Sequence, residues 1–151
     1  MKRHMKRTLA RACVFATGLV WISASGIAHH GDSGRYEDKL TTVTGTVAEL
    51  QLINPHSVLV LDVTDESGKV VKWRGELGGA QGMKRWCWTK ETVKNGDKMT
   101  MTGRRLKNGS PYMTLSEGAR VYDASGKEIF RGNDPGQPPG GGAPPPCASA
   151  Q

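Results

Sequence analysis

The feature that most restricts the fold of this chain is a series of short strand-like runs over residues 41–130, separated by turn residues. In residues 70–77, apolar side chains alternate with charged ones, so that one face of the run is apolar and the other is charged. Residues 57–64 are almost continuously apolar, which is typical of a strand buried along most of its length. The sequence therefore predicts a small, mainly β domain.

The first strand-like run, residues 42–53, is long for one strand. Gly45 and a phase slip between Val47 and Leu50 predict a bend or a bulge within it. Residues 79–94 have no period-two alternation and predict one or two short helices. The strands that we expect are residues 42–53, 57–64, 70–77, 97–104, 112–116, 120–122 and 128–130.

Three strands, a short helical insertion and two further strands follow the element order of the OB-fold, a five-stranded Greek-key barrel. The long first strand fits this fold, because there it takes part in both sheets. We expect an OB-like β-barrel at residues 41–132, preceded by an irregular lead-in at residues 29–40. A Pro/Gly-rich tail at residues 133–151 has no apolar content to bury, and we expect it to be disordered. A small β-sandwich of other connectivity is the alternative fold.

The first 28 residues have the character of a secretory signal peptide. Residues 2–11 carry five cations and no acid, residues 12–28 are uncharged, and the segment ends with Gly26-Ile27-Ala28. The uncharged stretch is shorter than the roughly 20 apolar residues of a membrane span. We expect cleavage after Ala28, a periplasmic or secreted protein, and no transmembrane segment in the mature chain. An uncleaved membrane anchor is the alternative.

The formal net charge of +7 is concentrated in the expected signal peptide, which holds five of the 21 basic residues and none of the 14 acidic ones. The mature chain is therefore only weakly basic, which gives little support for nucleic-acid binding. A patch of cations beside Trp86 or Trp88 is conceivable, but we expect a solvated basic surface instead. The residues of that patch would be Lys84, Arg85, Lys90, Arg104, Arg105 and Lys107.

Several short motifs in the chain resemble a family of small secreted bacterial proteins of unknown function. They are His29-His30, Thr44-Gly-Thr-Val47, Asn54-Pro-His56, Asp62-x-x-Asp65 with Gly68-Lys69, Trp73, Glu76-Leu-Gly78, Trp88-Thr89, and Lys94-x-Gly-Asp97 leading to Thr102-Gly103. The resemblance covers residues 29–130 and implies a secreted OB-like barrel, but it implies no activity. This chain has Cys87 where the family pattern more usually has glycine.

Three histidines remain after the expected cleavage: His29, His30 and His56. An N-terminal histidine can chelate a metal ion through its α-amine and a ring nitrogen, and further imidazoles complete a site that suits copper(II). His56 follows the strand-breaking Asn54-Pro55, where an N-terminal segment could reach it. We therefore predict a copper or zinc site at these three histidines. The alternative is that the first two are solvated terminal residues and that His56 caps a loop.

Met99 and Met101 are spaced to lie on one side of a strand. Periplasmic OB-folds that bind copper(I) or silver(I) use a histidine, methionines and a tryptophan, which makes these two methionines, with Trp73, candidate soft-metal ligands. Methionines at this spacing are more often part of a core, and that is the alternative we favour.

Cys87 and Cys147 are the two cysteines of the mature chain and could form a disulfide in an oxidising compartment. A loop of roughly 60 residues closed in this way would stabilise the fold by roughly 4 kcal/mol in the chain-entropy description. A buried, unpaired Cys87 is the alternative.

The sequence contains no G-x-S-x-G, H-E-x-x-H, Walker or C-x-x-C motif. Asp62 could orient His56 if the strand brings the two together, but no nucleophile accompanies them. We therefore expect a non-enzymatic exported binding protein. The alternatives are a cell-envelope structural or protein-interaction module that binds no metal, and a copper-dependent oxidoreductase built on His29.

Overall fold

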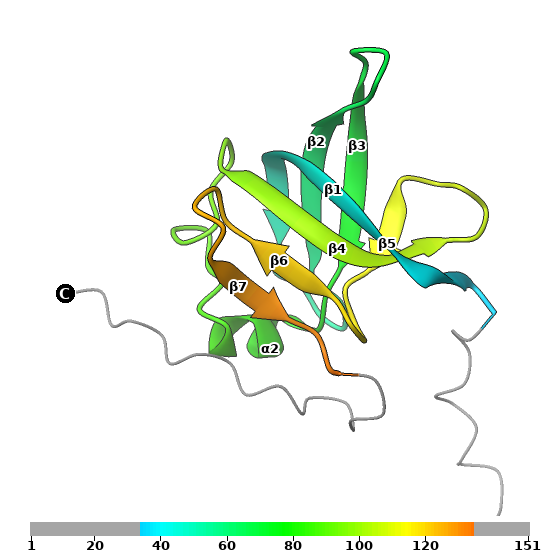
Figure 1. Ribbon diagram of the computed structural model, residues 1–151. Helices are drawn as coiled ribbons and strands as arrows, with labels where there is room; N and C mark the ends of the chain where they lie inside the picture. The colour runs from blue at the N-terminus through cyan, green and yellow to red at the C-terminus, as the bar shows by residue number, and fades with distance from the viewer. Residues whose placement is uncertain (1–33, 135–151) are drawn as a thin grey trace, which may run out of the picture. The chain divides into compact units, whose positions relative to one another are not determined.

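A computed structural model of the chain describes residues 34–134. Helix α2 lies between the third and fourth strands along the chain (Figure 1). The elements are β1 (Tyr36–Gln51), β2 (Val58–Thr64), β3 (Val70–Glu76), α2 (Ala80–Arg85), β4 (Lys98–Leu106), β5 (Tyr112–Thr114), β6 (Arg120–Tyr122) and β7 (Glu128–Arg131). The predicted mainly β class and the predicted order of elements are confirmed.

Five of the strands close into a ring. The order around the ring is β1-β2-β3-β5-β4, and β4 pairs back onto β1. The β3–β5 pairing is parallel, and the other pairings in the ring are antiparallel. β1 serves two neighbours because it is long: residues 46–51 pair with β2, and residues 36–46 pair with β4. β6 pairs with β4 outside the ring, and β7 continues the sheet from β6.

The two ends of β1 test two predictions. The register against β2 shifts between Val47 and Glu49, which confirms the predicted bulge. The predicted irregular lead-in is wrong for residues 36–40, because β1 begins at Tyr36 and pairs there with Leu106 of β4. Tyr36 is the only buried residue among these five, so the segment lacks the apolar alternation that identifies a strand in sequence.

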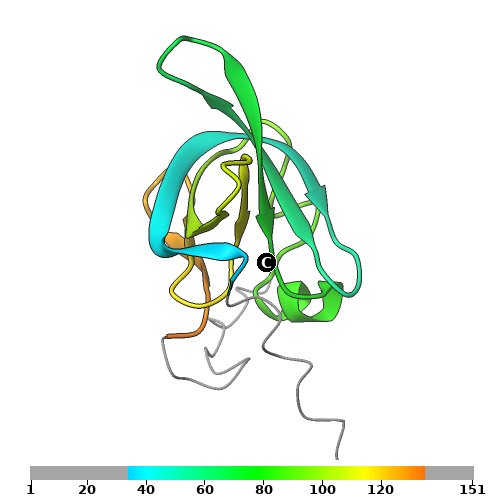
Figure 2. The ribbon, with the colours of Figure 1, turned by 90° about the vertical axis from the view of Figure 1, so that its right-hand side faces the viewer.

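The hydrophobic core lies inside the ring and continues under the segment that follows β3. α2 lies at one end of the ring, and the β2–β3 hairpin projects at the other end (Figures 1 and 2). Met83 of α2 belongs to the same core as the strand residues, as do Trp88 and Val93 from the segment after α2. The other buried residues of this core are Val47, Leu50, Leu59, Leu61, Leu77, Met99, Met101, Met113, Leu115, Ala119, Val121 and Phe130.

Two hairpin turns have the same chemistry, at residues 65–69 and 123–127, both with the sequence Asp-x-Ser-Gly-Lys. In each, one aspartate oxygen accepts hydrogen bonds from the backbone N–H and the hydroxyl of the serine, and from the backbone N–H of the lysine. The serine hydroxyl is the main reason why the pKa values of Asp65 and Asp123 lie below the ordinary value. Both turns lie in gaps between the strands expected from the sequence, and both fix the register of their hairpins.

Among residues 34–134, the structure contains no helix with the length and apolar character needed to cross a membrane. The predicted signal peptide at residues 1–28 and the tail from residue 135 onward lie outside the described residues.

Candidate functional site

His56 lies in the loop between β1 and β2, and its side chain is 58% exposed. Backbone hydrogen bonds fix this loop against the end of β3: Ser57 donates to Gly78 over 3.1 Å, and Leu77 donates to Ser57 over 2.8 Å. The carboxamide of Asn54 accepts a hydrogen bond of 3.1 Å from the first backbone N–H of α2. The Asn-Pro-His motif therefore presents an exposed imidazole from a rigid loop.

Glu76 and Tyr112 form a polar cluster with His56. Nδ1 of His56 lies 3.4 Å from Oε1 of Glu76. The phenol of Tyr112 donates a hydrogen bond to the other oxygen of the same carboxylate. Burial and, next, this bond to Glu76 raise the pKa of Tyr112 well above its ordinary value, so the phenol keeps its proton and acts as a donor.

This arrangement has a chemical consequence for His56. A carboxylate beside Nδ1 favours the tautomer with the proton on that nitrogen and leaves the lone pair of Nε2 for a ligand. Metal-binding histidines commonly have such a second partner, which orients the ring and raises its basicity. Among residues 34–134, however, no group of three or more His, Cys, Asp or Glu side chains is placed to hold a metal ion. Within the described part of the chain, His56 is thus an exposed imidazole with one carboxylate beside its Nδ1.

The other residues of the predicted metal site, His29 and His30, lie outside the described residues. The suggestion that Asp62 orients His56 is wrong. Asp62 lies on β2 opposite Lys72 and forms an ion pair with its Nζ over 2.8 Å. The carboxylate that lies beside His56 is Glu76.

Sequence reasoning missed Glu76 and Tyr112 as partners of His56. Glu76 belongs to the charged face of β3, and this alternation was visible in the sequence. Its proximity to Tyr112 comes from the parallel pairing of β3 with β5, in which Glu76 and Thr114 are register partners. No sequence signal identifies that pairing without knowledge of the fold.

The candidate soft-metal ligands lie in the core: Met99 is 3% exposed, and Met101 and Met113 are fully buried. Trp73 is partly buried against the same core, and the guanidinium of Arg105 lies 5.1 Å from the centre of its ring. These positions agree with the core-packing alternative. Metal ligation by Met99 and Met101 stays a prediction.

Of the two aromatic residues considered beside a basic patch, Trp86 is partly buried against the core and Trp88 is buried within it. Trp88 is 2% exposed, and its indole N–H donates to a backbone carbonyl, so its ring has no face for a base to stack on. Arg104 forms an ion pair of 2.7 Å with Glu117. Arg105 donates to the backbone oxygen of Ser110 over 3.0 Å. Arg104 and Arg105 thus have roles within the fold.

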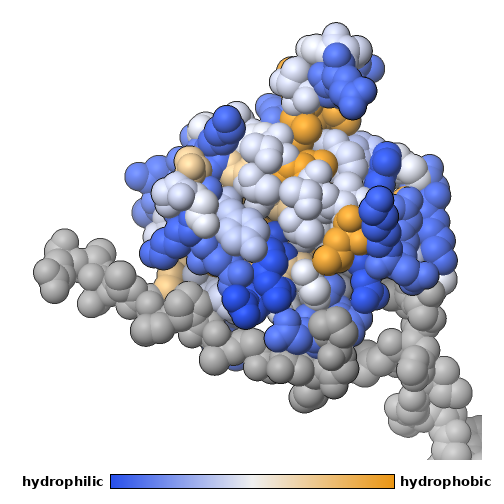
Figure 3. All heavy atoms as spheres, viewed as in Figure 1, coloured by the Kyte–Doolittle hydropathy of each residue, from blue (hydrophilic) through white to orange (hydrophobic). Residues whose placement is uncertain are grey.

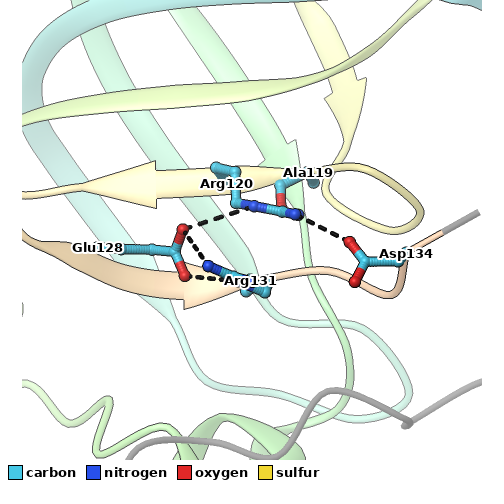
Figure 4. Close-up of polar contacts among 5 residues, drawn as sticks. All are labelled: Ala119, Arg120, Glu128, Arg131 and Asp134. Carbon is cyan, nitrogen blue, oxygen red and sulfur yellow. Dashed lines mark hydrogen bonds and ion pairs between the residues drawn. The ribbon is translucent and has the colours of Figure 1, made fainter.

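An ion-pair network joins β6 to β7 and the residues that follow (Figure 4). Arg120 lies 2.9 Å from Asp134 and 3.5 Å from Glu128, and it donates to the carbonyl of Ala119 over 2.8 Å. Glu128 also accepts from Arg131 over 2.7 Å. Arg120 is on β6, Glu128 and Arg131 are on β7, and Asp134 follows β7, so this network ties the two strands of the last hairpin to each other and to the residues after it.

Cys87 has a φ of 63°, in the left-handed region that favours glycine. The more usual glycine at this position of the family pattern therefore has a backbone reason. Cys87 is disulfide-bonded, and the other two cysteines of the chain, Cys13 and Cys147, lie outside the described residues. The pairing of Cys87 with Cys147 stays a prediction.

We expect C87G to be more stable than C87A by about 1 kcal/mol, because only glycine adopts this backbone conformation without steric cost. Both variants lose the disulfide, so their difference reports the backbone alone. Urea unfolding of the two variants in parallel measures it. Equal midpoints would show that residue 87 leaves the left-handed region when the cysteine is removed.

The chain was compared with curated proteins, solved structures and protein-family models. No curated protein and no solved structure matches the chain. A family model described as a family of unknown function, DUF6152, matches residues 16–114, which include β1 to β5 and the cluster of His56, Glu76 and Tyr112. The suspected membership of a family of unknown function is thereby confirmed, and the chain belongs to DUF6152.

Proposed function

We propose that this chain is an exported binding protein that holds a copper or zinc ion with His56 and the first two residues of its mature form, His29 and His30. The observation that carries the proposal is the oriented imidazole of His56, whose Nδ1 faces Glu76 and whose Nε2 is left for a ligand. An N-terminal histidine supplies an α-amine and an imidazole from one residue. His56 would supply a further imidazole ligand, from the folded domain, to the ion held by this chelate.

The scaffold of this proposal is an OB-like barrel. Its support is the closed ring in the order β1-β2-β3-β5-β4, with a parallel β3–β5 pair and a first strand shared by two neighbours. His56 and Glu76 meet at the end of β3 where the chain leaves the ring for α2. A ligand held there would be bound by a preformed loop, which lowers the entropy cost of binding.

Titration of the processed chain with copper(II) tests the proposal. We expect the protein that begins at His29 to bind copper(II) with a dissociation constant below micromolar. Calorimetry and electron paramagnetic resonance measure this binding. H56A should weaken the affinity by about tenfold or more, because one ligand is lost. E76Q keeps the imidazole and removes only the carboxylate beside it. This variant should weaken the copper(II) affinity by about 10-fold to 100-fold and change the pH dependence of binding.

A matched control carries one extra alanine before His29, which removes the α-amine from the chelate and leaves every side chain in place. This control should bind copper(II) less tightly than the processed chain. Binding no tighter than micromolar by the processed chain, or equal affinity in H56A, would overturn the proposal. N-terminal sequencing of the exported protein must also give His29 as the first residue.

A further inference from the structure

The outer face of β1, β4 and β6 carries a row of polar side chains away from the histidine cluster. Thr44 of β1 is the register partner of Thr100 of β4, which is in turn the partner of Tyr122 of β6. Their chain neighbours Met101 and Val121 are buried in the core, so the row faces outward. Figure 3 shows pale, weakly polar side chains interspersed with hydrophobic ones across the middle of this face, with strongly hydrophilic ones around them.

A pocket of about 430 Å³ lies over this row. Its lining includes Thr44, Thr100 and Tyr122 together with Lys98 and Asp123. The pocket is a depression broadly open to solvent, and its volume falls within the range of about 300–1,000 Å³ of small-molecule sites. The wall formed by the turn between β6 and β7 is rigid, because the Asp-x-Ser-Gly-Lys bonds described above hold it.

The chemistry of the lining suits a neutral ligand with several hydroxyl groups. The hydroxyls of Thr44 and Thr100 are hydrogen-bonded to each other at 2.8 Å, and each keeps capacity for a further bond. Lys98 and Asp123 place one cation and one anion on the same lining, so the pocket has no net charge to attract an anion. Within residues 34–134, Lys98 has no ion-pair partner, and the second carboxylate oxygen of Asp123 has no hydrogen-bond partner. Both groups can therefore bind a ligand.

We infer that this pocket is a saccharide-binding site for a neutral sugar unit, separate from the proposed metal site. The ring of Tyr122 offers an apolar face for the C–H groups of a pyranose, and its phenol remains a polar handle. The two threonine hydroxyls, the Lys98 ammonium and the Asp123 carboxylate bind the sugar hydroxyls. Nothing in this assignment depends on His56 or on a metal ion.

Nuclear magnetic resonance titration of the mature chain tests the inference. The probes are three neutral oligosaccharides (cellotetraose, maltotetraose and tetra-N-acetylchitotetraose) and, separately, inorganic phosphate. We expect at least one saccharide to cause saturable shifts of the backbone amides at residues 44, 98–100 and 122–126. Y122A should weaken the binding by about tenfold or more, whereas Y122F, which keeps the ring, should stay within about threefold of the wild type.

The matched control comes from the neighbouring row. Thr42 forms the same kind of hydroxyl pair, with Thr102 at 2.8 Å, but does not line the pocket. T100V should weaken saccharide binding, and T42V should leave it unchanged. Equal losses in the two variants, or no saturable saccharide shift at these amides, would overturn the inference. Saturable shifts with phosphate alone would also overturn it and would make the pocket an anion site.

Discussion

Replacement of Trp88 by alanine is expected to lower the free energy of unfolding by about 3–5 kcal/mol. Trp88 is 2% exposed and packs its ring edge-on against Phe130, with the ring centres 5.9 Å apart. Its indole N–H donates a hydrogen bond of 3.0 Å to the backbone oxygen of Ile129. The side chain thus joins the segment after α2 to β7. A loss of this size is a large part of the stability of a small domain.

Urea unfolding followed by circular dichroism measures this loss, and two variants interpret it. Trp86 also packs on Phe130, with ring centres 5.2 Å apart, but it is only partly buried, so W86A should cost less than W88A. W88F keeps most of the buried apolar area and loses the indole bond, which should cost about 1–3 kcal/mol. If W86A proves more destabilising than W88A, Trp88 is not the anchor of this core.

Much of the fold could be predicted from side-chain alternation and from turn residues. The continuous apolar run of β2 was expected to be buried, and Leu59, Val60 and Leu61 are buried. The alternation of β3 is confirmed by its exposed Lys72 and Arg74. These predictions succeeded because burial imposes a local pattern on a strand: alternation where one face is covered, and a continuous apolar run where both are.

The candidate site was less accessible to sequence reasoning. His56 could be singled out because histidines are few and because it follows a strand break. Glu76 and Tyr112 are 36 positions apart, and they meet only because β3 and β5 pair in parallel. Asp62 was named on the condition that the strand brings it to His56, yet β2 places it opposite Lys72. Contacts set by ring closure leave no local pattern in the sequence.

The Thr-Gly pairs of the family-like motifs have a physical reason that sequence alone did not give. A side chain on Gly45 of β1 would overlap the backbone oxygen of Asp62 on β2. A side chain on Gly103 of β4 would overlap the backbone oxygen of Thr114 on β5. Both glycines lie where a strand of the ring passes close to the backbone of its neighbour. Glycine is the residue that permits such an approach.

G103A is therefore expected to lower the free energy of unfolding by about 3 kcal/mol or more, because the added Cβ meets fixed backbone and β4 cannot move away from β5 without also leaving β1.

G75A is the graded comparison: its Cβ would meet the flexible ends of Leu115 and Met101, so its cost should be smaller. G82A lies in α2 with open space around it and should raise the stability by about 0.5–1 kcal/mol. Urea midpoints measured together should follow the order G82A, wild type, G75A, G103A. A G103A protein as stable as the wild type would contradict the close approach of β4 and β5 at this position.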